Sequence, residues 1–223
     1  ISGGCLKVRV GDSPNDTCEV YQKLICDRSQ LFENAMKHDW KEARERYVSL
    51  PHDDPEAFEI YMHWLYTRHI ATKVDVEGEE GNKDYMRLAK ALVSGEKLQD
   101  DDFIDTVTDA FIAKSNTSTS GVSHPFPEIP VICHLYEHTS KATPIRRLLV
   151  DLWLHSGNAR WFNEGGSEEE PPPELLVALC KGFYLHTQDN ATGVYKNGSA
   201  AEVCERYHKH PNDGKCYRRK AEF

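Results

Sequence analysis

The chain lacks several features that would place it in a special class. No apolar run approaches the roughly 20 residues that a membrane-spanning helix needs. The phosphate-binding loops G-x-G-x-x-G and G-x-x-x-x-G-K-[ST] are missing, as are the hydrolase signatures G-x-S-x-G and H-E-x-x-H. The seven cysteines are odd in number and irregularly spaced, so we expect reduced thiols and no disulfide framework. These absences favour a cytoplasmic or nuclear protein without a membrane anchor.

Basic side chains are in the minority. The 223 residues include 27 Lys and Arg against 36 Asp and Glu, which gives a net charge of −9. Because this charge repels phosphate polymers, nucleic acid is disfavoured as a partner. The exception is the stretch from Cys204 to Lys220, which holds six basic and two acidic residues. We expect only this tail to bind an anion.

Hydrophobic patterns predict a small sheet followed by many helices. Residues 6–10 and 18–21 alternate around a turn and predict a β-hairpin, and residues 47–50 predict a third strand. A helix is predicted behind Asp54 and Pro55, because the Asp side chain can cap it and Pro fits its first position. A polar loop is predicted over 74–84. Apolar stripes predict further helices over 85–93, 103–111, 131–136, 144–152 and 175–183.

The composition also suggests how the chain divides. A Ser/Thr-rich stretch at 115–123 indicates a linker. We therefore expect one domain over 1–114, a linker over 115–127, a helical extension over 128–190 and a polar tail with Cys and His over 191–223. The first domain is expected to be α+β, with a small sheet that caps a helical cluster.

Several stretches together resemble the BTB/POZ domain in the form common in fungal proteins. The stretches that carry this resemblance are 8–11 (VRVG), 20–26 (VYQKLIC), 50–58 (LPHDDPEAF), 64–67 (WLYT) and 95–103 (GEKLQDDDF). Residues 135–139 and 144–151 resemble the helical extension of fungal BTB proteins. Tyr21 and Gln22 depart from the family, which usually shows His before Lys, so one helix-capping contact should differ. The resemblance implies a BTB/POZ fold with a C-terminal helical extension, and protein binding in place of catalysis.

The resemblance also implies the kind of partner. BTB domains bind each other, act with transcriptional regulators, or hold a cullin in a ubiquitin ligase. Cullin-binding members carry a hydrophobic-x-Glu triplet before the third strand, where this chain has Trp40-Lys41-Glu42, although a Trp at a helix end can equally cover its own core. The expected partner groove comprises Trp40, Glu42, Phe58, Tyr66 and His69.

Self-association is a further expectation from the family. Family dimers exchange an extra helix and strand ahead of the first hairpin, and only Ile1 to Cys5 precede that hairpin here. We therefore expect any homo-oligomer to form without this exchange, through a helix face or a sheet edge.

The tail contains a set of metal-ligating side chains. Cys204 and His208 are four residues apart and would share one helical face, while His210 would approach from another side. Pro211 is expected to end the helix, and the Asn-Asp-Gly turn behind it can return Cys216 to the same place. These four residues predict a structural zinc site with no open position for catalysis. A disulfide between Cys204 and Cys216, or solvated side chains, are the alternatives.

One run suggests an enzyme. His134-Leu-Tyr-Glu137-His138 spells H-x-x-E-H, the signature of inverted zinc peptidases, in which the Glu serves as a base. A third ligand would have to come from downstream, for example from Glu202 or Glu205. Against this reading, Leu135 and Tyr136 belong to an apolar stripe. A zinc hydrolase is therefore the alternative to an adaptor.

Overall fold

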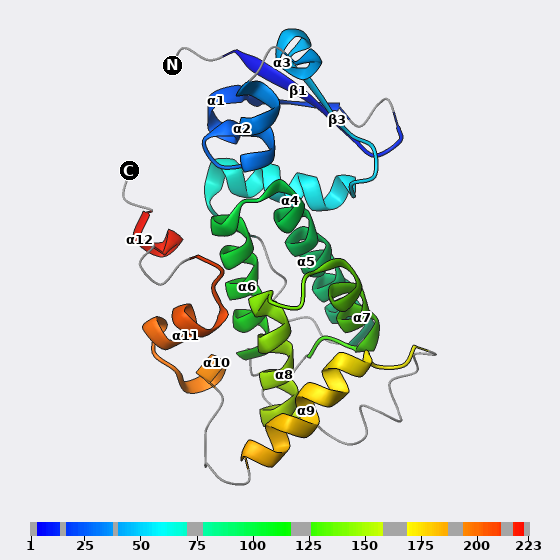
Figure 1. Cartoon of the computed structure of the whole chain (residues 1–223), viewed down its shortest axis with the longest axis vertical. Helices are drawn as coiled ribbons and strands as arrows, with labels where there is room; N and C mark the ends of the chain where they lie inside the picture. Colours follow the sequence, from blue (N-terminus) through cyan, green and yellow to red (C-terminus); the bar gives the residue numbers. More distant parts are fainter. Residues whose placement is uncertain are drawn as a thin grey trace.

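The computed structural model describes residues 4–13, 17–37, 40–70, 78–116, 126–157, 169–186, 194–210 and 216–220. Figure 1 shows a small sheet at one end of the molecule, with helices making up the remainder. The strands are β1 (Cys5–Val10), β2 (Thr17–Tyr21) and β3 (Tyr47–Leu50). The helices are α1 (Gln22–Cys26), α2 (Gln30–Lys37), α3 (Lys41–Glu45), α4 (Pro55–Thr67), α5 (Gly78–Leu98), α6 (Asp101–Asn116), α7 (Ile129–His138), α8 (Pro144–Ser156), α9 (Pro173–His186), α10 (Val194–Asn197), α11 (Ala200–Tyr207) and α12 (Tyr217–Lys220). The predicted α+β class is confirmed.

The three strands form one sheet in the order β2-β1-β3. β1 and β2 are antiparallel, with Leu6 opposite Val20, whereas β1 and β3 are parallel, with Val8 opposite Val48. All four of these apolar side chains are buried. Gly11 follows β1 with a φ of 75°, a left-handed conformation that favours glycine, and its N–H donates to the Leu50 carbonyl at 2.9 Å. The predicted hairpin and third strand are confirmed.

α4 begins where the sequence predicts it. The side chain of Asp54 accepts a hydrogen bond from the Ala57 N–H at 3.0 Å and so caps the helix. Trp64 is buried, and its indole N–H donates to the Thr106 hydroxyl at 3.1 Å. Its ring also lies 5.1 Å from that of Phe103. α4 therefore turns its aromatic face toward α6.

Two predicted breaks differ from the structure. The loop expected over 74–84 is helical from Gly78, where α5 begins, while residues 74–77 lie outside the described residues. Asp84 belongs to the core because its carboxylate pairs with the buried ammonium of Lys114 at 3.2 Å. The first two residues of the expected 115–123 linker complete α6, and the others lie outside the described residues. The polar composition of residues 74–84 therefore predicted a start for α5 that is too late in the sequence.

The hydrophobic core continues from the first domain into the helices that follow. Buried side chains from the sheet, from α4 to α9 and from α11 belong to one contiguous cluster. The tail is not wholly polar, since Val203 and Tyr207 of α11 are buried in that cluster. α11 packs against α8, and α12 packs against α6. The tail is thus part of the packed structure.

Within the described ranges, every helix is too short or too polar to cross a bilayer.

Candidate metal centre

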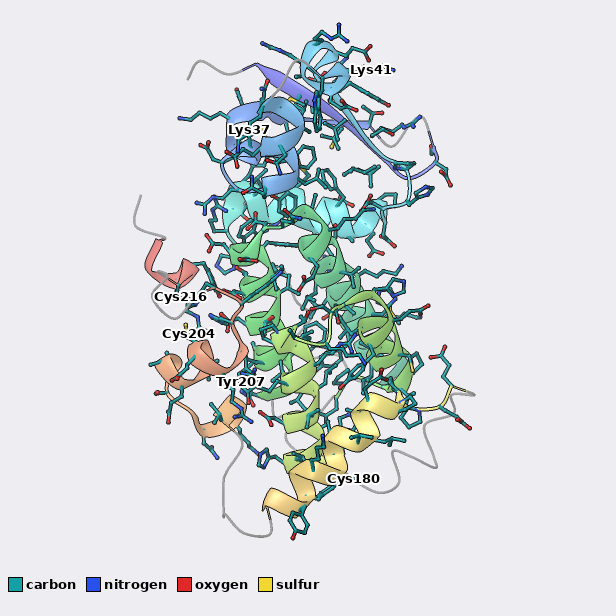
Figure 2. The ribbon with its side chains drawn as sticks, in the orientation of Figure 1. Lys37, Lys41, Cys180, Cys204, Tyr207 and Cys216 are labelled. Carbon is teal, nitrogen blue, oxygen red and sulfur yellow. The ribbon has the colours of Figure 1, made fainter. Side chains whose placement is uncertain are left out.

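The four predicted zinc ligands lie together. Cys204 is on α11 and Cys216 directly precedes α12 (Figure 2). One ligand atom from each of Cys204, His208, His210 and Cys216 lies within 4.8 Å of the other three. The Cys204 sulfur is 3.0 Å from His210 Nε2, and the Cys216 sulfur is 3.5 Å from His208 Nδ1. Zinc bonds of about 2.0–2.3 Å place tetrahedral ligand atoms about 3.3–3.8 Å apart. The cluster therefore has the donors and the size for one zinc ion.

Both cysteines are free thiols, so the disulfide alternative is not formed. Cys204 is half-buried, and burial is the main cause that raises its pKa to about 11. Cys216 and His208 are buried. Because thiolates bind zinc and thiols do not, a metal would have to displace the protons of the two cysteines.

The local chain path differs from the prediction. α11 starts with a capping box, in which Ser199 accepts from the Glu202 N–H and the Glu202 carboxylate accepts from the Ser199 N–H. The helix ends at Tyr207, so His208 is extended and does not share a helical face with Cys204. The backbone N–H of Lys209 donates to the Asp105 side chain at 2.6 Å. This N–H is therefore not available for a helical hydrogen bond. Pro211 therefore does not end the helix, and the turn behind it lies outside the described residues.

A carboxylate of α6 orients one of the histidines. His208 Nε2 lies 3.1 Å from an oxygen of Asp109, so the ring can donate there and keep Nδ1 as the ligand atom. Metal-binding histidines commonly have such a carboxylate partner. Burial works against ionisation of Asp109, but hydrogen bonds from His208, Tyr217 and Arg218 outweigh it and lower its pKa. Asp109 is thus a charged anchor for His208.

A second carboxylate of α6, that of Asp105, faces the cluster with one of its two oxygens. Asp105 is fully buried, and burial raises its pKa to about 6. One oxygen accepts from Lys209, but Oδ2 has no hydrogen-bond partner among the described residues. This oxygen lies 3.9 Å from His208 Nδ1 and 4.0 Å from His210 Nε2. A buried carboxylate oxygen without a hydrogen bond is costly, so its position beside the four ligands favours a cation there.

The acidic face of α6 is the part of the site that sequence reasoning missed. Asp101, Asp105 and Asp109 are spaced by four residues and therefore share one side of the helix. Lys209 pairs with Asp101 at 3.4 Å, and Arg218 pairs with Asp109. The sequence does contain a signal for this contact, because a stripe of aspartates and a basic tail are complementary in charge. Opposite charges therefore bring the tail onto α6.

The residues of the expected partner groove are not all at the surface. Phe58 is only 3% exposed and packs in the core against Tyr61, so its assignment to the groove is wrong. Its helix turns that face toward the interior. Trp40 is 55% exposed and precedes α3, where Glu42 is half-buried. α3 packs against α2 and β3.

Tyr66 and His69, at the end of α4, are exposed. The Tyr66 hydroxyl accepts from the Tyr21 N–H at 3.3 Å. Tyr21 is the N-cap of α1, and its side chain makes no capping hydrogen bond. This is the position at which we expected the helix-capping contact to differ from that of the family. Tyr21 and Tyr66 together form an exposed aromatic patch beside the sheet.

The H-x-x-E-H run forms one helix face on α7. The rings of His134 and His138 are 4.5 Å apart, and His138 Nδ1 lies 2.9 Å from the backbone carbonyl of His134. Burial lowers the pKa of His134. Glu202, a possible third ligand, is engaged in the capping box of α11. Among the described residues, the group of three or more metal-capable side chains is the one at 204–216.

No protein-family model matches the chain. A search of curated proteins found the isoleucine–tRNA ligases of Pyrococcus horikoshii and Pyrococcus furiosus, each 27% identical over 181 residues. The match covers 77% of this chain but only 14% of each ligase, so the chain spans a small part of these relatives. At this identity the match is a similarity over part of each ligase and does not establish a shared family.

Proposed function

We propose that the chain is a protein-interaction adaptor with a BTB/POZ-type domain and a helical extension, and that it holds a cullin or another BTB protein in the cytoplasm or nucleus. The sequence resemblance over residues 6–113 supports this proposal. So does the order of the elements, with a hairpin, a parallel third strand and then α4 to α6. The observation that carries the proposal is the exposed Trp40 at the N-cap of α3, with Glu42 in the first turn of that helix and β3 directly behind it.

Binding would depend on burial of a few aromatic side chains. More than half of Trp40 is accessible, so a partner can cover a large apolar surface there. Tryptophan and tyrosine often dominate the binding energy of an interface. Glu42 can accept a hydrogen bond from the partner next to this anchor, and Tyr21 with Tyr66 offers a second aromatic contact. The core residue Phe58 has no part in this surface.

Substitution of Trp40 by Ala tests the adaptor proposal. We expect the variant to lose co-purification with a cullin or a BTB partner, while its unfolding free energy changes by less than about 1 kcal/mol because the side chain is exposed. Phe183→Ala is the matched control, since Phe183 is 54% exposed on α9. Retained binding by the Trp40 variant, or equal loss in both variants, contradicts the proposal. A loss of several kcal/mol in stability would make Trp40 a core residue.

We further propose that the 204–216 cluster binds zinc and that its role is structural. Two thiolates and two imidazoles form a closed tetrahedral set, which leaves no position for a substrate. A bound ion would connect the end of α11 to the start of α12. Because Asp105 and Asp109 contact the histidine region from α6, the ion would also fix the tail to the helical core.

Metal analysis of purified protein tests the zinc proposal. We expect about one zinc per chain, lost in Cys204→Ala and kept in His134→Ala. The second variant is the control because His134 lies on α7, within the H-x-x-E-H run. Loss of zinc with His134→Ala and its retention with Cys204→Ala would instead favour the hydrolase alternative.

A further inference from the structure

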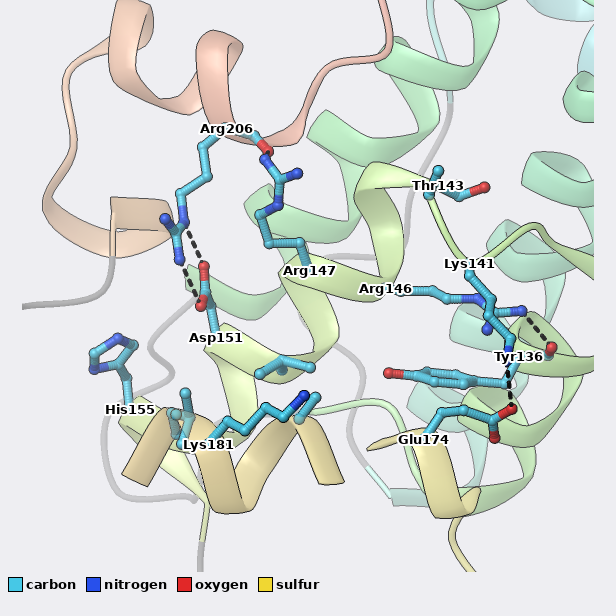
Figure 3. Close-up of a pocket in the computed structure, with 15 residues that line it drawn as sticks. Tyr136, Lys141, Thr143, Arg146, Arg147, Asp151, His155, Glu174, Lys181 and Arg206 are labelled. Carbon is cyan, nitrogen blue, oxygen red and sulfur yellow. Dashed lines mark hydrogen bonds and ion pairs between the residues drawn. The ribbon is translucent and has the colours of Figure 1, made fainter. Parts of the chain in front are cut away.

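A groove of about 680 Å³ lies between α8 and α9, with α11 at one end (Figure 3). Five basic residues and two carboxylates are among its lining residues, so the groove carries three excess positive charges. The chain as a whole has a net charge of −9. The groove is thus a local basic site on an acidic protein.

The fold builds this groove from a close helix crossing. Gly182 of α9 packs on Leu154 of α8 so closely that a Cβ at position 182 would lie 2.4 Å from a Leu154 methyl carbon. Beside this contact, Val150, Leu154 and Ala178 give the groove an apolar part. The groove therefore combines apolar surface with cationic side chains.

Two of the five cations are already neutralised. The guanidinium of Arg206 makes two hydrogen bonds to Asp151, at 2.6 and 2.9 Å. Lys141 lies 3.6 Å from Glu174. The two carboxylates of the groove are therefore occupied by these partners.

The other three cations form no direct ion pair with a carboxylate within the ranges that the structure describes, although the charge of Arg146 helps to lower the pKa of Glu174. Arg146 donates to the Tyr136 carbonyl and to the Thr139 hydroxyl, and its guanidinium lies 4.5 Å from the centre of the Tyr136 ring. Arg147 donates to a backbone carbonyl of α11 at 2.9 Å. Lys181 is exposed on α9. These neutral contacts leave the three charges available to an anion.

The length of the groove indicates the kind of anion. Its lining extends along α8 from Thr143 to His155, which is about 18 Å at 1.5 Å per residue. An extended peptide advances about 3.3 Å per residue, so about five residues fit along this distance. A phosphate or a small carboxylic acid would occupy only part of it.

From this geometry we infer that the groove binds an extended acidic segment of a partner protein. Carboxylates of the segment pair with Arg146, Arg147 and Lys181, and an apolar side chain between them packs on Val150 and Leu154. This site is separate from the surface at Trp40. Each proposal can therefore fail without the other.

Fluorescence anisotropy tests the inference with a labelled peptide of about ten residues, made of glutamates with two central leucines. The control peptide carries glutamine in place of each glutamate. The intact chain is expected to bind the acidic peptide and not the control, and added salt is expected to weaken the binding because exposed charges are screened.

Lys181→Glu is expected to weaken binding about tenfold, which corresponds to about 1.4 kcal/mol of binding free energy. Lys37→Glu is the matched control, because Lys37 is an exposed lysine on α2, at the opposite end of the molecule from α9 (Figure 2). Equal binding by wild type and Lys181→Glu, or failure of the acidic peptide to bind, overturns the inference. Binding of pyrophosphate that depends on Lys181, without peptide binding, would make this a small-anion site and also overturn it.

Discussion

Replacing Cys204 by Ala removes one of four ligand atoms and should separate the effect of zinc from the effect of packing. A ligand that binds only the folded chain adds about 4 kcal/mol to its stability when its free concentration is a thousand times the Kd. Without metal, the substitution should cost about 1 kcal/mol, because the side chain is only half-buried and little volume is lost. The substitution should therefore cost about 5 kcal/mol with zinc at that concentration and about 1 kcal/mol without it, a difference of about 4 kcal/mol.

Thermal unfolding followed by circular dichroism measures this difference. For a chain of this size, 4 kcal/mol corresponds to a Tm change of roughly 8 to 16 °C. We expect wild type to show this change between buffered free zinc and excess chelator, and Cys204→Ala to unfold at the lower temperature in both. Cys180→Ala is the control, because Cys180 is exposed on α9 and lies away from the cluster (Figure 2).

Hydrogen exchange locates the effect. Without zinc, α12 is expected to lose protection, while α11 keeps most of its protection because buried Tyr207 donates to Asp151 at 2.7 Å. The reasoning is refuted if wild type shows no response to zinc, or if Cys204→Ala responds as strongly as wild type.

Two further predictions concern buried charges of the core. Burial raises the pKa of the Asp100 carboxyl to about 6, so the folded state binds the carboxyl proton more tightly than the unfolded chain does. The resulting contribution to stability is present at low pH and is lost as the pH rises through about 6. Between pH 4 and 7 the unfolding free energy should therefore fall less in Asp100→Asn than in wild type, by about 2 kcal/mol in urea titrations. An unchanged pH dependence in the variant would contradict this. Asp84→Ala leaves the ammonium of Lys114 buried without its carboxylate and should cost about 3–5 kcal/mol in the same assay. Asp84→Leu combined with Lys114→Met is expected to recover most of that loss, and a cost below 1 kcal/mol for Asp84→Ala alone would contradict the role of the pair.

The sequence was sufficient where structure depends on neighbours along the chain. The alternation at 6–10, 18–21 and 47–50 located the strands, and the cap at Asp54 located the start of α4. Apolar spacing identified helices α5 to α9, although the polar start of α5 was missed. The chemistry of the four metal-capable side chains in the tail was also readable, because Cys and His are the residues that bind zinc.

Only the tertiary structure decided which residues meet across long stretches of chain. It placed Phe58 in the core, Trp40 at the surface and Asp84 beside Lys114. It also brought Asp105 of α6 to the ligands of the tail, about a hundred residues later. Local patterns could not predict these contacts, because a helix stripe shows which side is apolar or charged but not which distant segment will pack against it. The basic groove has the same origin, since its charges come from separate helices that meet only when α8, α9 and α11 pack together.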